Sequence, residues 1–257
     1  MNTPASFFML LALLSLLAAP AHSTPEDDPS PGDLEQLRER YSKRLEELGP
    51  TPQERLAEVA VDAKQRAEIR ERIENFAYIQ QQGGTRKIRW KRRDEVVKAY
   101  GVKATLFLCE VLGSKRYWSA RTAAQALTAL AGQEPKQVRW LAMRDDAPSA
   151  LIAAFNSGPA YELVGYHLNL DAALRALTGL NPLADELKLS KQASEEEARA
   201  EGKRARALWQ KAYAKHRQAW LDEEQKRARE RRELERKLDL IERGVDPERR
   251  ADEERSG

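Results

Sequence analysis

The stretches AAQALTAL at residues 123–130 and ALRALTGL at residues 173–180 resemble each other and decide the expected fold. They agree at five of eight positions with an offset of 50 residues. Ala and Leu at three- and four-residue steps favour helices with one apolar face, and the small side chains let neighbouring helices approach closely. A spacing of this length between short helical segments is typical of helical repeat proteins. We therefore expect an all-α core built from repeated helices.

The surroundings of both stretches extend this pattern. Residues 103–132 (KATLFLCEVLGSKRYWSARTAAQALTALAG) combine an apolar helix, a short polar turn, Arg121 early in a second helix and a run of small residues. Residues 171–183 (DAALRALTGLNPL) contain a Leu-Thr-Gly ending, and a Trp-containing segment follows at 207–221. Over residues 103–221 the chain resembles exported bacterial HEAT-like helical repeat proteins. The resemblance implies a solenoid that serves as a scaffold or binding surface, and it implies no catalytic residues.

The remainder of the chain divides into segments of different composition. Gly49-Pro50 interrupts two apolar stripes, which predicts two antiparallel helices joined by a tight turn. Opposite charges four residues apart follow Leu221, as in a solvated, self-supporting helix. We expect, in chain order, a helical hairpin at 34–82, HEAT-like repeats at 85–184, a charged insert with a long C-terminal helix at 185–243, and a disordered tail at 244–257.

The first residues have the pattern of an export signal. An apolar run of thirteen residues at 7–19 (FFMLLALLSLLAA) is shorter than the about 20 residues that a membrane-spanning helix needs. Pro20 ends the run, and Ala21 and Ser23 are small residues suited to a cleavage site. We expect a signal peptide at 1–23, a disordered acidic and Pro-rich linker at 24–33, and a mature protein that is periplasmic or secreted. An uncleaved anchor is the alternative.

Two features are expected to belong to the core. Cys109 is the single cysteine, so an internal disulfide is excluded, and its apolar neighbours predict a buried, unreactive thiol. Trp209, Tyr213, His216 and Trp220 share one helical stripe. Such a stripe could line a ligand groove, but aromatic residues at helical spacing more often pack inside a protein.

A basic cluster is the candidate site. Six of the eight residues between positions 86 and 93 are Lys or Arg, and they surround Trp90. Such a cluster can bind phosphates or other anions of a cell envelope. The alternative is a solvated connector in which Ile88 and Trp90 face the core. The candidate residues are Arg86, Lys87, Arg89, Trp90, Lys91, Arg92 and Arg93.

The expected function follows from the charge balance of the chain and from its lack of known catalytic motifs. The net charge is only +3, with 44 Lys and Arg against 41 Asp and Glu, so no global field draws the chain to nucleic acid. The sequence has no zincin, P-loop, nucleophile-elbow or dinucleotide-binding motif. We therefore predict no catalytic, cofactor-binding or metal-binding residues and no transmembrane span.

The expected function is that of an exported, non-enzymatic scaffold whose partner is another protein. Two alternatives remain open. One is a binder of the anionic envelope surface that uses residues 86–93. The other is an enzyme whose site carries no recognisable motif.

Overall fold

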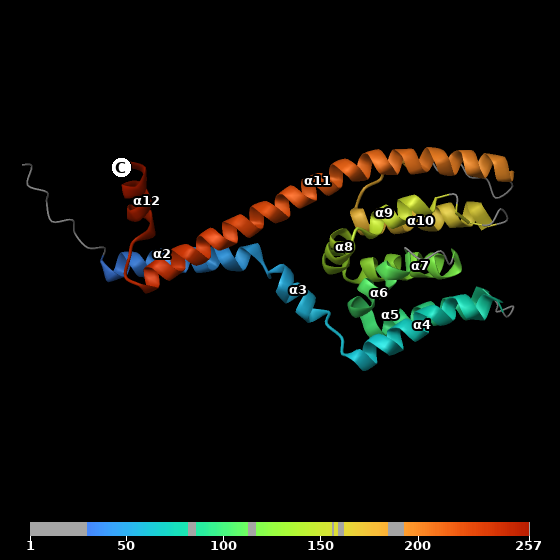
Figure 1. The fold of residues 1–257 in the computed structure, drawn as a ribbon, viewed down its shortest axis with the longest axis horizontal. Helices are drawn as coiled ribbons and strands as arrows, with labels where there is room; N and C mark the ends of the chain where they lie inside the picture. Colours follow the sequence, from blue (N-terminus) through green and yellow to red (C-terminus); the bar gives the residue numbers. More distant parts are fainter. Residues whose placement is uncertain are drawn as a thin grey trace, which may run out of the picture. The chain divides into compact units, whose positions relative to one another are not determined.

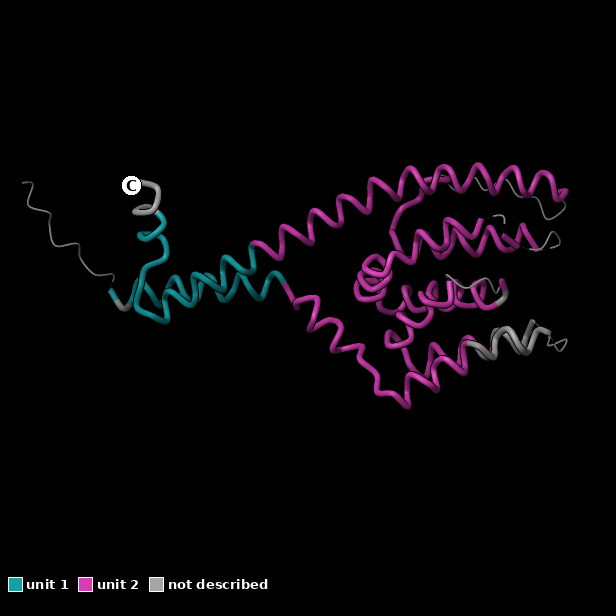
Figure 2. Tube along the Cα trace, viewed as in Figure 1, with its two compact units in different colours: residues 1–48, 230–257 teal, residues 49–229 magenta. Residues whose placement is uncertain are grey.

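The computed structural model describes residues 30–81, 86–112, 117–155, 157–158, 162–184 and 193–256. Within these ranges the regular structure consists of helices without any strand, which confirms the all-α class. Among the described helices, none has the length and apolarity to cross a bilayer. The chain forms two compact units, residues 1–48 with 230–257 (unit 1) and residues 49–229 (unit 2) (Figure 2). The expected signal peptide lies outside the described residues.

Unit 2 contains most of the helices, drawn in layers in Figure 1. They are α3 (Pro52–Glu58), α4 (Ala63–Gln81), α5 (Arg86–Tyr100), the short 3-10 helix η1 (Gly101–Ala104), α6 (Thr105–Leu112), α7 (Tyr117–Gln133), α8 (Pro135–Arg144), α9 (Ala147–Ala154), α10 (Leu163–Thr178) and the first part of α11 (Glu195–Glu242).

The two similar stretches lie in α7 and α10, which pack against each other. Leu127 and Leu177, equivalent positions in the two stretches, are both fully buried. Thr128 donates a hydrogen bond to the carbonyl oxygen of Ala124 at 2.9 Å, and Thr178 repeats this bond to Leu174 at 2.7 Å. The stretches differ in how they end, because Gly179, with φ of +74°, terminates α10 whereas α7 continues to Gln133.

The first part of α11 is fixed to unit 2 by aromatic side chains. Trp209 is fully buried, and its indole Nε1 donates a hydrogen bond to Asp171 Oδ1 at 2.9 Å. The hydroxyl of Tyr213, which is also buried, donates to Asp146 Oδ1 at 2.7 Å. Arg217 lies 2.7 Å from the same Asp146 oxygen. The prediction that the aromatic stripe packs inside the protein is thus confirmed for Trp209 and Tyr213, its two most buried residues.

Cys109 is buried on α6, as predicted. Its burial raises the pKa of the thiol far above its ordinary value, and the charges of Asp145 and Glu110 act in the same direction. Because the thiolate is the reactive form, Cys109 is an apolar packing residue and not a nucleophile.

The N-terminal segment differs from the expected hairpin at 34–82. Thr51 and Glu54 form a capping box, since Thr51 Oγ1 accepts from Glu54 N at 3.1 Å and Glu54 Oε2 accepts from Thr51 N at 2.6 Å. The helix that starts there, however, ends at Glu58, and Asp62 begins α4 by accepting from Gln65 N at 2.7 Å. Residues 34–48 belong to unit 1 and residues 49–82 to unit 2, so they do not form one domain.

Unit 1 joins the two ends of the chain. Helix α2 (Pro31–Leu48), which already begins inside the expected linker, packs on the last part of α11. Tyr41, Leu234 and Ile241 are buried between them, and Arg44 Nε lies 2.7 Å from Glu230 Oε1. The leucine stripes of residues 34–48 and 234–241 therefore cover each other.

The expected disorder at 244–257 is wrong for most of this tail, because residues 247–256 form helix α12 (Pro247–Ser256). Gly244, with φ of +76°, permits the reversal after α11. Asp246 then accepts from Glu248 N at 2.8 Å, and Pro247 occupies the first turn. The carboxylate of Glu248 accepts hydrogen bonds from Tyr41 at 2.9 Å and from Arg40, which ties α12 to α2.

Candidate functional site

A surface groove of about 410 Å³ lies where α5, α7 and α10 of unit 2 meet. Helices α7 and α10 supply its walls and α5 supplies one residue at its margin. The lining residues are Arg93, Arg121, Gln125, Thr128, Gly165, Leu168, Asn169 and Ala172. Two of them are arginines, and each is ion-paired with a carboxylate beside the groove, Arg93 with Asp94 and Arg121 with Glu162.

The polar floor of the groove is held by bonds between the two long helices. Gln125 Nε2 of α7 donates to Asn169 Oδ1 of α10 at 2.9 Å. Asn169 in turn donates to the carbonyl oxygen of Gly165, one helical turn earlier. These bonds fix both amides in one orientation, which is the condition for a preorganised polar surface.

Arg121 crosses from α7 to α10 at one end of the groove. Its guanidinium forms an ion pair with Glu162, and its side chain is only 12% exposed. It also donates a hydrogen bond to the hydroxyl of Tyr117 at 3.4 Å. A Cβ atom at Gly165 would lie 3.3 Å from Arg121 Nη2, so the glycine provides the room in which the guanidinium lies. Arg121 is therefore a structural bridge between α7 and the segment before α10 at the groove margin.

Leu168 is the apolar feature of the groove. Its side chain is 47% exposed, the most exposed large apolar residue of the described part of unit 2. Leu163, Tyr166, Leu170 and Leu174 on the same helix are buried. Leu168 lies off this buried stripe. An apolar residue outside the stripe is the sequence signal that could have identified Leu168 as exposed. An exposed leucine between two fixed amides and two arginines is suited to recognition of an amphipathic segment.

The predicted basic cluster falls on the first turns of α5, where the alternative interpretation was a solvated connector. The structure instead has one continuous helix from Arg86 to Tyr100. Lys91 is exposed, and Arg93 is half-buried, lines the groove and lies 2.5 Å from Asp94. Of the candidate residues, the side chains of Arg86, Lys87, Arg89, Trp90 and Arg92 lie outside the described part of the structure.

Two aspartates of unit 2, Asp146 and Asp171, hold helices together and do not line the groove. Asp146 and Asp171 accept the bonds from α11, and Asp171 also pairs with Arg175 at 2.7 Å. Asp146 directly precedes α9, and no local pattern in the sequence indicates its contact with Tyr213, 67 residues away. Within the described ranges, no group of three or more His, Cys, Asp or Glu is placed to hold a metal ion.

His167 is the buried histidine of α10, with its ring 5.5 Å from that of Phe155. Burial lowers its pKa to about 4. The unfolded chain binds this proton near pH 6.5, so the folded state loses stability as the pH falls from 6.5 to 4. We expect His167 to lower the free energy of unfolding by at most about 3 kcal/mol across this window.

Urea unfolding of the wild type and of His167→Leu, measured between pH 7 and pH 4, checks this expectation. Leucine fills a similar apolar site and cannot bind a proton, so the variant should lose less stability on acidification. Equal losses in the two proteins would show that His167 does not titrate in this way.

In comparisons with known proteins, no family model, curated protein or solved structure matches the chain.

Proposed function

We propose that this chain is an exported, non-enzymatic scaffold that binds a segment of another protein in the groove between α7 and α10. The equivalent packing of Leu127 and Leu177, and of Thr128 and Thr178, supports a HEAT-like repeat as the basis of this scaffold. In such repeats, stacked helices present an extended binding surface. The observation that carries the proposal is the exposed Leu168 within a fixed polar lining.

The groove lining defines the chemistry of the partner segment. An apolar side chain would cover Leu168 and remove its exposed surface from water. Arg93 and Arg121 are paired with Asp94 and Glu162, so the groove margin is polar without an excess of positive charge. The fixed amides of Gln125 and Asn169 can exchange hydrogen bonds with a peptide backbone. The partner is therefore an amphipathic protein segment.

Replacing Leu168 by Asp should abolish this binding, because the new charge lies where an apolar side chain of the partner would pack. Since Leu168 is already half-exposed, the fold should be preserved and the melting temperature should change little. We expect at least a tenfold loss of a partner retained by the wild type in a pull-down from envelope extract.

The matched control is Ala214→Asp, which introduces the same charge at an exposed position of α11 in the same unit. A partner retained by wild type and by Ala214→Asp but lost from Leu168→Asp supports the groove. Binding that both variants retain equally would contradict it. Loss of protein partners accompanied by a hydrolytic activity would favour an enzyme instead.

A further inference from the structure

The charge of the chain is divided unevenly between its two units. Unit 2 holds 32 Lys and Arg against 23 Asp and Glu, which gives it a net charge of +9. Unit 1 holds 12 against 18, a net charge of −6, so the small overall charge of +3 conceals two opposite charges. Because a net charge already subtracts every carboxylate, ion pairs within unit 2 cannot cancel its excess. Such an asymmetry points to an anionic partner for the basic part of a chain.

Part of this excess lies on the outer side of α11. In Figure 1 the first part of this helix lies at the edge of unit 2, beside α9 and α10. Ten of its residues between positions 203 and 219 are exposed, and the other five beside the cations are alanines and glutamines. The stretch 202–221 contains no Asp or Glu. The five exposed cations are Lys203, Arg204, Arg206, Lys211 and Lys215.

Three of these cations form no ion pair within the part of the chain that the structure describes. They are Arg206, Lys211 and Lys215, whereas Arg204 pairs with Glu201 at 2.5 Å. Lys211 and Lys215 are one helical turn apart, a spacing at which like charges destabilise a helix. The helix thus carries a cost in this stretch that no carboxylate of the same stretch relieves.

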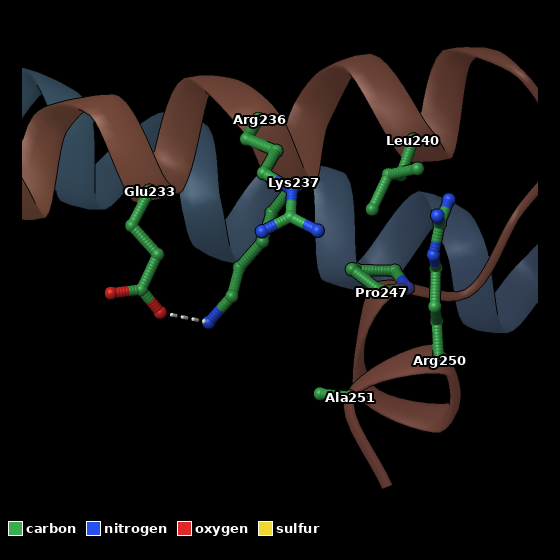
Figure 3. Close-up of a pocket in the computed structure, with 7 residues that line it drawn as sticks. All are labelled: Glu233, Arg236, Lys237, Leu240, Pro247, Arg250 and Ala251. Carbon is green, nitrogen blue, oxygen red and sulfur yellow. Dashed lines mark ion pairs between the residues drawn. The ribbon is translucent and has the colours of Figure 1, made fainter. Parts of the chain in front are cut away.

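The last part of α11, in unit 1, is arranged differently. Its cations alternate with carboxylates, as Lys237 pairs with Glu233 at 2.9 Å (Figure 3) and Arg243 pairs with Asp239 at 2.8 Å. Lys237 and Glu233 both line the cavity drawn in Figure 3, so that cavity presents charges of both signs. An unbroken positive surface is therefore a property of residues 203–219 and not of α11 as a whole.

The chemistry of this surface fits a plane of negative charges. Trp209 and Tyr213 are buried and hydrogen-bonded to unit 2, so the outer side of α11 is presented on a helix that is held in place. The cations are spread along about 18 Å of helix, which suits many anions better than a single ligand. None of the exposed residues at 203–219 is aromatic or a large apolar residue. Protein interfaces bury such residues at their centre, so this surface can attract a partner by charge alone.

We propose that the 203–219 surface of α11 binds the face of a bilayer that contains anionic phospholipids. Lys and Arg near such a bilayer are attracted by its negative surface potential, and each of them adds to the binding. The charge of unit 2 favours this approach, and the charge of unit 1 opposes it, so unit 2 makes the contact. The surface is separate from the groove between α7 and α10, and either proposal can fail without the other.

Sedimentation of the full chain with lipid vesicles tests the assignment. We expect the wild type to bind vesicles of equal parts phosphatidylglycerol and phosphatidylcholine at low salt, and to be released at high salt because the ions screen the attraction. Vesicles of phosphatidylcholine alone should not bind it. The variant Lys211→Glu/Lys215→Glu should bind the anionic vesicles at least tenfold more weakly. Both positions are exposed, so the fold should be preserved.

The matched control is Lys98→Glu/Lys136→Glu, which changes exposed lysines of α5 and α8 in the same unit. It lowers the net charge of unit 2 by the same amount as the α11 variant. It therefore separates the position of the charges from their number, and it should lose much less binding than the α11 variant.

A fluorescent label gives a second measurement that does not depend on changing the charge. Because Cys109 is buried, a cysteine introduced at an exposed position can be labelled alone. A label at Ala207→Cys, on the outer side of α11, should be quenched by spin-labelled lipid head groups in the anionic vesicles. A label at Ala99→Cys, exposed on α5, should be quenched less.

Four results would overturn the proposal. One is a wild type that does not bind the anionic vesicles. Another is equal binding by the α11 variant and the control. The third is stronger quenching at position 99 than at 207, which would favour the basic segment at 86–93. The fourth is salt-sensitive self-association of the wild type without vesicle binding, which would assign the surface to the acidic unit 1 of a second copy.

Discussion

Replacing Leu127 by Asp is expected to unfold unit 2. Leu127 is fully buried on α7, within the main apolar core and in the helix that packs on α10. Burial of a leucine contributes about 1.5–3 kcal/mol, and an unpaired carboxylate in its place costs several kcal/mol more. The total approaches the about 5–15 kcal/mol of a typical folded domain.

The equivalent residue in α10, Leu177, should respond in the same way, since it is also fully buried. Thermal unfolding followed by circular dichroism measures both variants. Leu127→Met, which keeps the volume and the apolar character, serves as the control and should cost less than about 1.5 kcal/mol. An aspartate variant with the melting temperature of the wild type would refute the packing of α7 against α10.

Trp209→Ala should cost about 3–5 kcal/mol and loosen the first part of α11. The indole is fully buried, so its removal leaves a large cavity. It also removes the indole N–H that donates to Asp171 at 2.9 Å. Of the two contacts described for this buried carboxylate, the ion pair with Arg175 then remains. Urea unfolding gives the change in free energy.

Amide hydrogen exchange separates the two consequences of this substitution. Protection should fall most within residues 195–229 of α11, because Trp209 and Tyr213 anchor that part of the helix. The control Trp209→Phe keeps most of the packing and loses only the indole donor, so it should cost about 1–3 kcal/mol. A Trp209→Ala protein with undiminished protection in α11 would contradict this anchoring.

The sequence predicts the helices well because their apolar faces recur within a few residues. The stripes around Leu127 and Leu177 identify α7 and α10, and the capping box at Thr51 marks the start of α3. The same local rules explain the long charged helix, which runs from Glu195 to Glu242. Burial of Cys109 also follows from its neighbours alone.

Pairing between distant segments could not be predicted in this way. The leucine stripe of α2 can pack on any apolar helix face, and nothing local specifies the 234–241 stripe as its partner. Helix α12 has local signals, Gly244 and Asp246 followed by Pro247, but its few apolar residues resemble a disordered tail.

The groove depends on the same kind of distant contact. Gln125 and Asn169 are 44 residues apart and meet only when α7 packs on α10. The basic segment at 86–93 is prominent in the sequence, yet among its described side chains only Arg93 reaches the groove. Charge density along the chain is therefore a poor guide to where a site forms, because a site depends on side chains from several helices.

Site-specific photo-cross-linking at position 168 tests the central claim most directly. A benzophenone amino acid replaces Leu168 in one protein and Ala214 in the control, and both are irradiated in envelope extract. We predict a discrete protein adduct at position 168 that is absent at 214, with an amphipathic cross-linked partner peptide. Identical adduct patterns at the two positions, or no protein adduct at 168, would contradict the assignment of this groove as a protein-binding site.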